Sequence, residues 1–218
     1  MIRVALRKLT ELVRTGAKPV LSANDFENKR NAFYRYSDTG DIAVVTFGDP
    51  GTVPKPMAAA EIGIGYSPRY HLEFLKDRGN EEIYVPHWTE AMFYWRLVPP
   101  EVASYAPERG QPWSEWWMLG DRTSQSAELL ASMLADEVIP ELTALESLDA
   151  QCAVIADSTG KIHVGPLSWG PVFVRLGRVP RAEVEAAIDA IPYEPMLAEF
   201  DPGFRSWARR KLDELEGA

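Results

Sequence analysis

The chain has 218 residues, of which 46% are hydrophobic and 25% charged, the composition of an ordinary soluble globular protein. It carries 23 Lys and Arg against 32 Asp and Glu, and this net charge of −9 argues against nucleic-acid binding, because phosphate backbones are bound by basic patches. The sequence contains no run of about 18 apolar residues, the length needed to span a membrane, and its N-terminus lacks the apolar core of a signal peptide. The lone Cys152 cannot form an internal disulfide, so we expect a cytoplasmic protein.

The first part of the chain predicts a helix followed by a β-hairpin. Residues 2–14 carry apolar side chains at helical spacing, and Gly16 and Pro19 are expected to end this helix. Two β-type runs, at 32–36 and 42–47, flank the turn sequence SDTGD. These two runs therefore predict the first two strands of a sheet.

Residues 60–66 alternate in side-chain size, as a strand with two different faces does. One face carries large apolar side chains, and the other has Gly63 and Gly65. With no side chains there, either a helix or a bulky ring packs close to the strand, or a ligand reaches it. We favour packing, and we keep as the alternative a ligand pocket near these glycines, Trp95 and Arg96.

The stretch from Tyr84 to Leu119 contains five of the seven tryptophans. Its two apolar runs, at 91–98 and 113–119, predict strands at the centre of the sheet. Large rings fill the interior of a small domain, which is the first interpretation of these tryptophans. The second is a partly exposed aromatic surface that binds a partner through Arg96, Trp113 and Trp116.

A long helix is expected from about residue 123 to 138, where Pro140 interrupts it. The segment 119–149 carries one basic and seven acidic residues, so two-thirds of the net charge lies there. Glu128 and Asp136 face water in this pattern. A basic protein is the partner that such a helix would attract.

After residue 149 the pattern restarts with a predicted hairpin, whose strands at 151–156 and 162–164 flank the turn DSTGK. Another strand is expected at 172–176, followed by two helices that begin at Pro180 and at Asp201. The whole order predicts an α+β fold, with an antiparallel sheet of about five strands and with the N-terminal and long helices on one face. We expect an α+β domain at 1–148 and a docked extension, a hairpin and two helices, at 149–218.

Several short motifs between the first helix and residue 148 follow one another in a characteristic order: Lys29–Arg35, His87-Trp88, Trp95–Leu97, Trp116-Trp117 and Val138–Leu142. In this order they resemble an uncharacterised bacterial family, the domain of unknown function 4304. The resemblance covers residues 3–148 and leaves the remaining segment outside. That family has no established activity, so the resemblance implies a fold and a bacterial source rather than a function.

Catalytic and metal-binding motifs are missing from the sequence. His71, His87 and His163 lie outside zinc-binding spacings, and no nucleophile elbow, phosphate-binding loop or dinucleotide fingerprint occurs. We expect no catalytic residue, no metal and no cofactor, and the sequence leaves the oligomeric state open.

The leading hypothesis is a non-enzymatic protein-interaction module of the immunity or regulatory type, without nucleic-acid or membrane partners. It would bind through an aromatic patch and an acidic helix, with the candidate residues Trp95, Arg96, Trp113, Trp116, Glu128 and Asp136. The alternative is a small-molecule-binding protein or enzyme with a pocket at the sheet centre.

Overall fold

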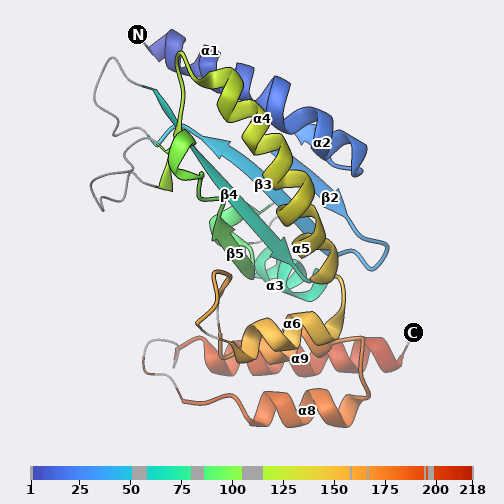
Figure 1. The fold of residues 1–218 in the computed structure, drawn as a ribbon. Coiled ribbons are helices and arrows are strands. Elements are labelled where there is room, and N and C mark those ends of the chain that lie inside the picture. The colour runs from blue at the N-terminus through green and yellow to red at the C-terminus, as the bar shows by residue number, and fades with distance from the viewer. Residues whose placement is uncertain are drawn as a thin grey trace.

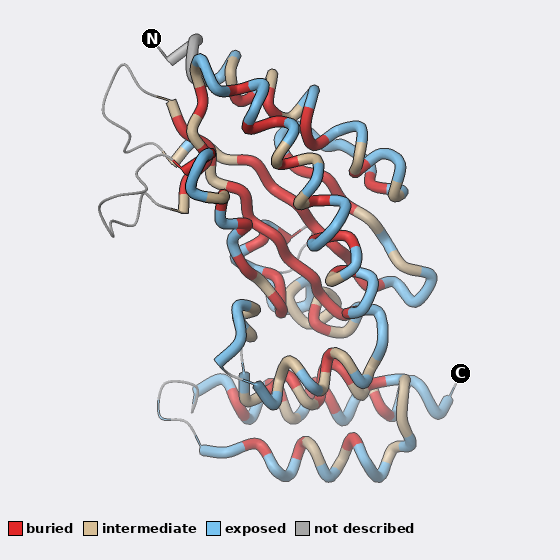
Figure 2. The backbone as a smooth tube through the Cα atoms, viewed as in Figure 1, coloured by how far each residue is buried: buried red, intermediate tan, exposed pale blue. Residues whose placement is uncertain are grey.

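The computed structural model describes residues 2–50, 58–79, 86–104, 115–157, 159–165, 167–193, 195 and 199–217, with side chains from residue 6 onward. It has an α+β fold in which two long helical stretches lie on an antiparallel sheet and further helices gather at one end of that sheet (Figure 1). Figure 2 shows that buried residues run along the central strands and the helix sides that face them.

The sheet has the strand order β1-β2-β3-β4-β5-β7, and β6 pairs with β4. Every pairing is antiparallel, which confirms the predicted fold class. β4 is the longest strand and lies between β3 and β5. The alternation at 60–66 predicted this strand, whereas the centre of the sheet was predicted at 91–98 and 113–119, where the described residues form only the shorter β5 and the two-residue β6. The strands are β1 Glu27–Lys29, β2 Ala32–Tyr36, β3 Ile42–Gly48, β4 Ala59–Ser67, β5 Phe93–Arg96, β6 Trp117–Met118 and β7 His163–Val164.

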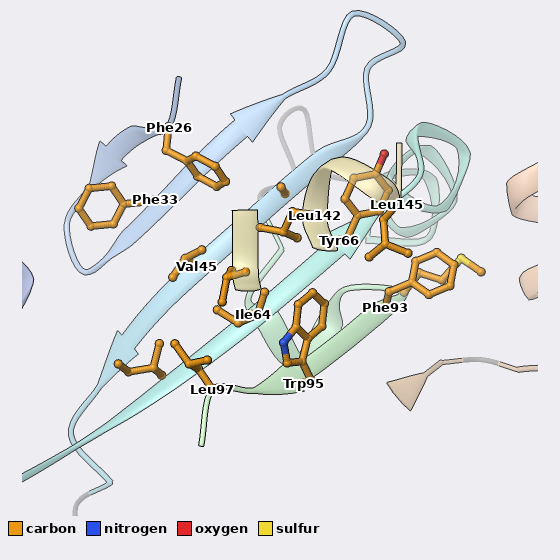
Figure 3. Close-up of a cluster of buried hydrophobic side chains, with 14 of the residues drawn as sticks. Phe26, Phe33, Val45, Ile64, Tyr66, Phe93, Trp95, Leu97, Leu142 and Leu145 are labelled. Atoms are coloured by element: carbon orange, nitrogen blue, oxygen red, sulfur yellow. The ribbon is translucent and has the colours of Figure 1, made fainter. Parts of the chain in front are cut away.

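One face of the sheet forms the main hydrophobic core. Phe33, Val45, Ile64 and Trp95 are directly opposite one another on neighbouring strands, so their side chains form a row across this face. Figure 3 shows this row together with Leu142 from the helical layer. All five side chains are at most 2% exposed, and burial of such apolar surface stabilises the domain.

Two long helical stretches cover this face, and each contains a π-helical turn followed by a proline. The first consists of α1 Ile2–Leu12, the turn η1 Val13–Ala17 and α2 Lys18–Ala23, and the second of α4 Thr123–Met133, the turn η5 Leu134–Val138 and α5 Ile139–Ala144. The predictions that Gly16 and Pro19 end the first helix and that Pro140 interrupts the second were wrong. The wider turns alter the hydrogen-bond pattern just before each proline, which then falls within the first two residues of the next helical segment, where its missing N–H costs little.

The two helical stretches run side by side in the same direction (Figure 1), and α1 and η1 both contact α4. Gly16 lies at their closest approach. A Cβ atom at Gly16 would lie 2.7 Å from the carbonyl oxygen of Ala127 and 2.9 Å from its Cα. Gly16 therefore allows the backbones to touch rather than ending its helix.

The C-terminal segment is more helical than its sequence indicated. It forms α6 Leu148–Ala156, α7 Gly170–Arg175, α8 Arg181–Asp189 and α9 Asp201–Glu216. The predicted hairpin was wrong, because residues 151–156 belong to α6, and β7 pairs with β5 instead. Ser147 caps α6 by accepting a hydrogen bond from the backbone N–H of Ala150, which stabilises the start of this helix.

The predicted strand at 172–176 was also wrong, because most of it lies in α7. Its β-branched residues favour a strand locally, but Pro171 occupies the first turn of a helix, a position that proline favours. Val172, Phe173 and Val174 are all buried, so tertiary packing outweighs their β propensity.

Helix α3, Arg69–Gly79, connects the sheet to the C-terminal helices. The Phe74 ring lies within 5.2–5.7 Å, between ring centroids, of four aromatic rings from the C-terminal segment: Trp169, Phe173, Phe204 and Trp207. Both of these indoles are hydrogen-bonded, Trp169 to Asp201 at 2.7 Å and Trp207 to Asp77 at 2.9 Å. The C-terminal helices thus share an aromatic core with α3.

Candidate functional site

The second face of the sheet carries Gly63 and Gly65, and the indole of Trp88 covers it. Trp88 belongs to a short 3-10 helix, Trp88–Glu90, and is buried. A Cβ atom at Gly63 would lie only 2.3 Å from the Trp88 ring, and one at Gly65 would lie 2.6 Å from the Cβ of Ala91. The packing interpretation is therefore confirmed, since a ring fills the space that the absent side chains leave.

Arg96 lies beside this ring and is held by two carboxylates. Its Nε is 2.7 Å from Glu61, its Nη1 contacts Glu115, and its guanidinium lies 5.8 Å from the centre of the Trp88 ring. Burial lowers the pKa of Arg96, but the hydrogen bond that Arg96 donates to Glu115 and the charge of Glu61 outweigh that effect, and the pKa is raised. Arg96 is 41% exposed, but its charge is already neutralised within the protein.

The tryptophans proposed as binding anchors do not form one patch in the described part of the chain. Trp95 is 2% exposed and lies on the core face, opposite to Arg96, so its side chain is not accessible to a partner. Trp116 is 8% exposed. Trp113 lies outside the described residues. Consecutive residues of a strand point to opposite faces, so the alternation in the predicted strand at 91–98 already separated Trp95 from Arg96, and the two cannot belong to one patch.

The acidic helix has the exposure that was expected of it. Glu128, Asp136 and Glu137 are exposed on α4 and η5, and no cation of the described residues lies within ion-pair distance of them. We call these three residues the acidic surface. Asp136 accepts a hydrogen bond of 2.8 Å from Ser132, which fixes its position.

Two neighbouring acidic residues are neutralised, in contrast to the acidic surface. Glu141 pairs with Lys161, and Glu146 pairs with Arg35 at 2.8 Å. The opposite side of the same helical stretch packs into the core, where Leu130, Leu134 and Val138 are fully buried. The uncompensated charge is therefore confined to the side that faces solvent.

A buried carboxylate, Asp41, joins the sheet to the C-terminal segment. Asp41 is 2% exposed and accepts hydrogen bonds from the Tyr66 hydroxyl at 2.7 Å and from the backbone N–H of Arg69 at 2.9 Å. Arg178, which follows α7, completes an ion pair with it. Burial raises the pKa of Tyr66 and the Asp41 charge raises it further, so the phenol stays protonated and donates its hydrogen bond.

Sequence reasoning missed this network because its members are far apart in the chain. Asp41 read as a turn residue, and nothing local distinguishes Arg178, which lies 137 positions away. Both carboxylate oxygens of Asp41 are engaged within the protein, although the buried Nη1 of Arg178 has no hydrogen-bond partner among the described residues. The network is therefore a structural element rather than a binding site.

The three histidines do not assemble a catalytic or metal site in the described residues. His71 is buried against Phe173, His87 caps the short 3-10 helix, and His163 lies against the ring of Tyr94. No group of three His, Cys, Asp or Glu side chains among the described residues could hold a metal ion. Among the helices that the structure describes, none combines the length and apolarity needed to cross a bilayer.

Comparison with protein-family models, with curated proteins and with solved structures found no match for the chain. The resemblance of residues 3–148 to the domain of unknown function 4304 stays a prediction. Proposals about function must therefore rest on the geometry and charge of the molecule itself.

Proposed function

We propose that the protein is a non-enzymatic binding module of the bacterial cytoplasm, of the immunity or regulatory type, whose acidic surface recognises a basic protein partner. The observation that carries the proposal is the uncompensated charge of Glu128, Asp136 and Glu137. Exposed carboxylates on a rigid helix attract a basic surface, increase the rate of encounter and disfavour acidic competitors.

The helix that carries these carboxylates supports them well. Its inner side is packed on the sheet and on α1, so the side chains project from a fixed backbone. Binding to a rigid surface loses less conformational entropy than binding to a mobile loop. A partner that places Lys or Arg opposite this surface would gain both charge complementarity and a defined orientation.

The aromatic half of the earlier hypothesis receives less support. Trp95 lies in the core, and the charge of Arg96 is satisfied by Glu61 and Glu115. The pocket considered at the sheet centre is filled by Trp88. We therefore base the proposed function on the acidic surface alone.

Charge-reversal variants test the proposal. The triple variant Glu128→Lys, Asp136→Lys, Glu137→Lys removes the acidic surface. A control changes three other exposed acidic residues that lack an ion pair among the described residues, by Asp38→Lys, Glu101→Lys and Glu183→Lys. Both variants change the net charge equally, so a difference between them reports the location of the charge.

The measurement is quantitative capture from the native host at low and at physiological salt, followed by affinity measurement with the purified partner. We expect the wild type and the control to retain one common basic partner, and the triple variant to bind it at least about tenfold more weakly. Salt should weaken binding to the wild type more than to the triple variant. Equal retention by the two variants, or no stoichiometric partner even at low salt, would contradict the proposal.

A further inference from the structure

A groove of about 340 Å³ lies between α3 and α9, away from the acidic surface. The rings of Phe74, Phe204 and Trp207 line it; Phe204 is fully buried and Trp207 is 4% exposed, so Phe74 is the ring that a ligand can reach most directly. Its volume is at the lower end of the range of about 300–1,000 Å³ that small-molecule sites occupy, and its aromatic floor is of the kind that binds a ring.

Gly203 keeps this groove open. It lies in the first turn of α9 and lines the groove, and a Cβ atom there would meet nothing within 4 Å. Its φ is not positive, so the backbone does not require glycine, and glycine is the poorest helix former after proline. Neither conformation nor a close contact requires glycine here, and a long side chain at this position would extend into the groove.

The lining of the groove also includes the charged residues Arg78 and Glu199. The guanidinium of Arg78 lies 4.5 Å from the centre of the Phe200 ring, and Glu199 precedes that ring in the chain. Neither Arg78 nor Glu199 has an oppositely charged partner among the described residues. Among the described residues, the lining of the groove therefore offers one cation and one anion without an ion-pair partner.

The other charged residues that line the groove, Asp77 and Arg210, already interact with groups of the protein. Asp77 accepts the indole N–H of Trp207, and it also lies 3.7 Å from Arg210. A ligand with a single charge would satisfy only one of the two free groups. A ligand with both charges on one carbon would satisfy both of them.

We propose that the α3–α9 groove binds a free aromatic amino acid as its zwitterion. The ring lies on Phe74 and against the exposed edge of Trp207, the ligand carboxylate contacts Arg78, and the ligand ammonium contacts Glu199. Arg78 keeps its position on Phe200 by a cation–π contact, so its edge N–H groups remain free to donate. This site is independent of the acidic surface, and it would make the protein responsive to a small metabolite.

Calorimetric titration with three probes tests the assignment of charges. The probes are L-phenylalanine, 3-phenylpropionate, which lacks the ammonium, and 2-phenylethylamine, which lacks the carboxylate. We expect Arg78→Gln to weaken the binding of L-phenylalanine about tenfold and to leave the binding of 2-phenylethylamine unchanged, because only L-phenylalanine has a carboxylate that contacts Arg78. Glu199→Gln should weaken the binding of L-phenylalanine to a similar extent and leave the binding of 3-phenylpropionate unchanged. Lys76→Gln, an exposed residue of α3 that does not line the groove, is the matched control and should bind as the wild type does.

Filling the groove gives a test that does not depend on charge. Gly203→Leu places a side chain in the open space, so it should abolish binding while raising the thermal midpoint by about 2 °C through better helix propensity. Gly203→Ala shares that stabilisation and is expected to retain binding. The proposal is overturned if L-phenylalanine does not bind the wild type at millimolar concentration, if Gly203→Leu binds normally, or if each charge variant weakens all three probes alike.

Discussion

His71 links the stability of the fold to pH, because it is buried where a protonated imidazole has little solvation. It is 3% exposed, its ring lies edge-on to Phe173 at 5.1 Å, and its Nδ1 is 3.3 Å from the Ser67 hydroxyl. Burial lowers the pKa of His71 from 6.5 to about 3. The folded protein therefore holds a neutral imidazole at pH values where the unfolded chain binds a proton.

The sign and size of the effect follow from this difference in proton binding. Above pH 6.5 His71 is neutral in both the folded and the unfolded state, so it does not change the free energy of unfolding. Below pH 6.5 only the unfolded state gains a proton at His71. Stability is therefore lost as the pH falls from about 6.5 toward 3. Between pH 7.5 and 5.0 the loss from this one group is about 2 kcal/mol, at about 1.4 kcal/mol for each pH unit once the unfolded histidine is protonated.

The assay compares urea unfolding of the wild type and His71→Phe at pH 7.5, 6.5, 5.5 and 5.0. Carboxylates that titrate in this range contribute equally to both proteins, so the difference in slope isolates His71. We expect the variant to lose about 2 kcal/mol less than the wild type on acidification, whatever its stability at pH 7.5. Parallel pH profiles would refute the reasoning, because they would mean that His71 takes up a proton while the protein is folded.

Three further substitutions test the packing. Gly16→Ala should destabilise the fold by about 1–3 kcal/mol in urea unfolding, because its Cβ meets the backbone of Ala127, whereas Gly48→Ala has open space and should cost less; equal costs would contradict the close contact. Asp41→Asn should cost about 3 kcal/mol in the same assay by leaving a buried guanidinium unpaired, and a neutral result would show that the ion pair adds nothing. Phe74→Ala should cost about 3 kcal/mol and reduce the near-UV circular dichroism of the tryptophans, and an unchanged spectrum would argue against the shared aromatic core.

The sheet could be predicted because the residues that define each strand and turn lie close together in the sequence. Alternating side chains in residues 60–66 identify β4 and its two faces, and the turn SDTGD identifies the hairpin of β2 and β3. The small face of β4 predicted that a helix or a ring packs close to Gly63, and the structure shows that it is the ring of Trp88. Patterns with a period of two residues report strand faces directly, so these predictions needed no long-range knowledge.

The errors arose where tertiary packing or a change in helical pitch outweighs local preference. Residues 151–156 are apolar enough for a strand, yet the Ser147 cap and neighbouring helices make them α6. Pro19 and Pro140 usually interrupt helices, but the π-helical turns before them allow both helices to continue. In the candidate site, helical periodicity predicted that the carboxylates of α4 and η5 are exposed. The α3–α9 groove could not be predicted, because its two helices are more than 120 residues apart in sequence.

The pairing of β7 with β5 has a consequence for synthesis on the ribosome. β5 ends at Arg96, and its partner on the outer edge begins at His163, so 66 residues separate them. At about 5–20 residues per second, translation of that interval takes roughly 3–13 s. During this time the backbone amides and carbonyls of β5 lack their native outer partner, and an unpaired edge is where another chain can add as a strand. The nascent chain is thus most exposed to aggregation in this interval, and chaperone protection should matter most there.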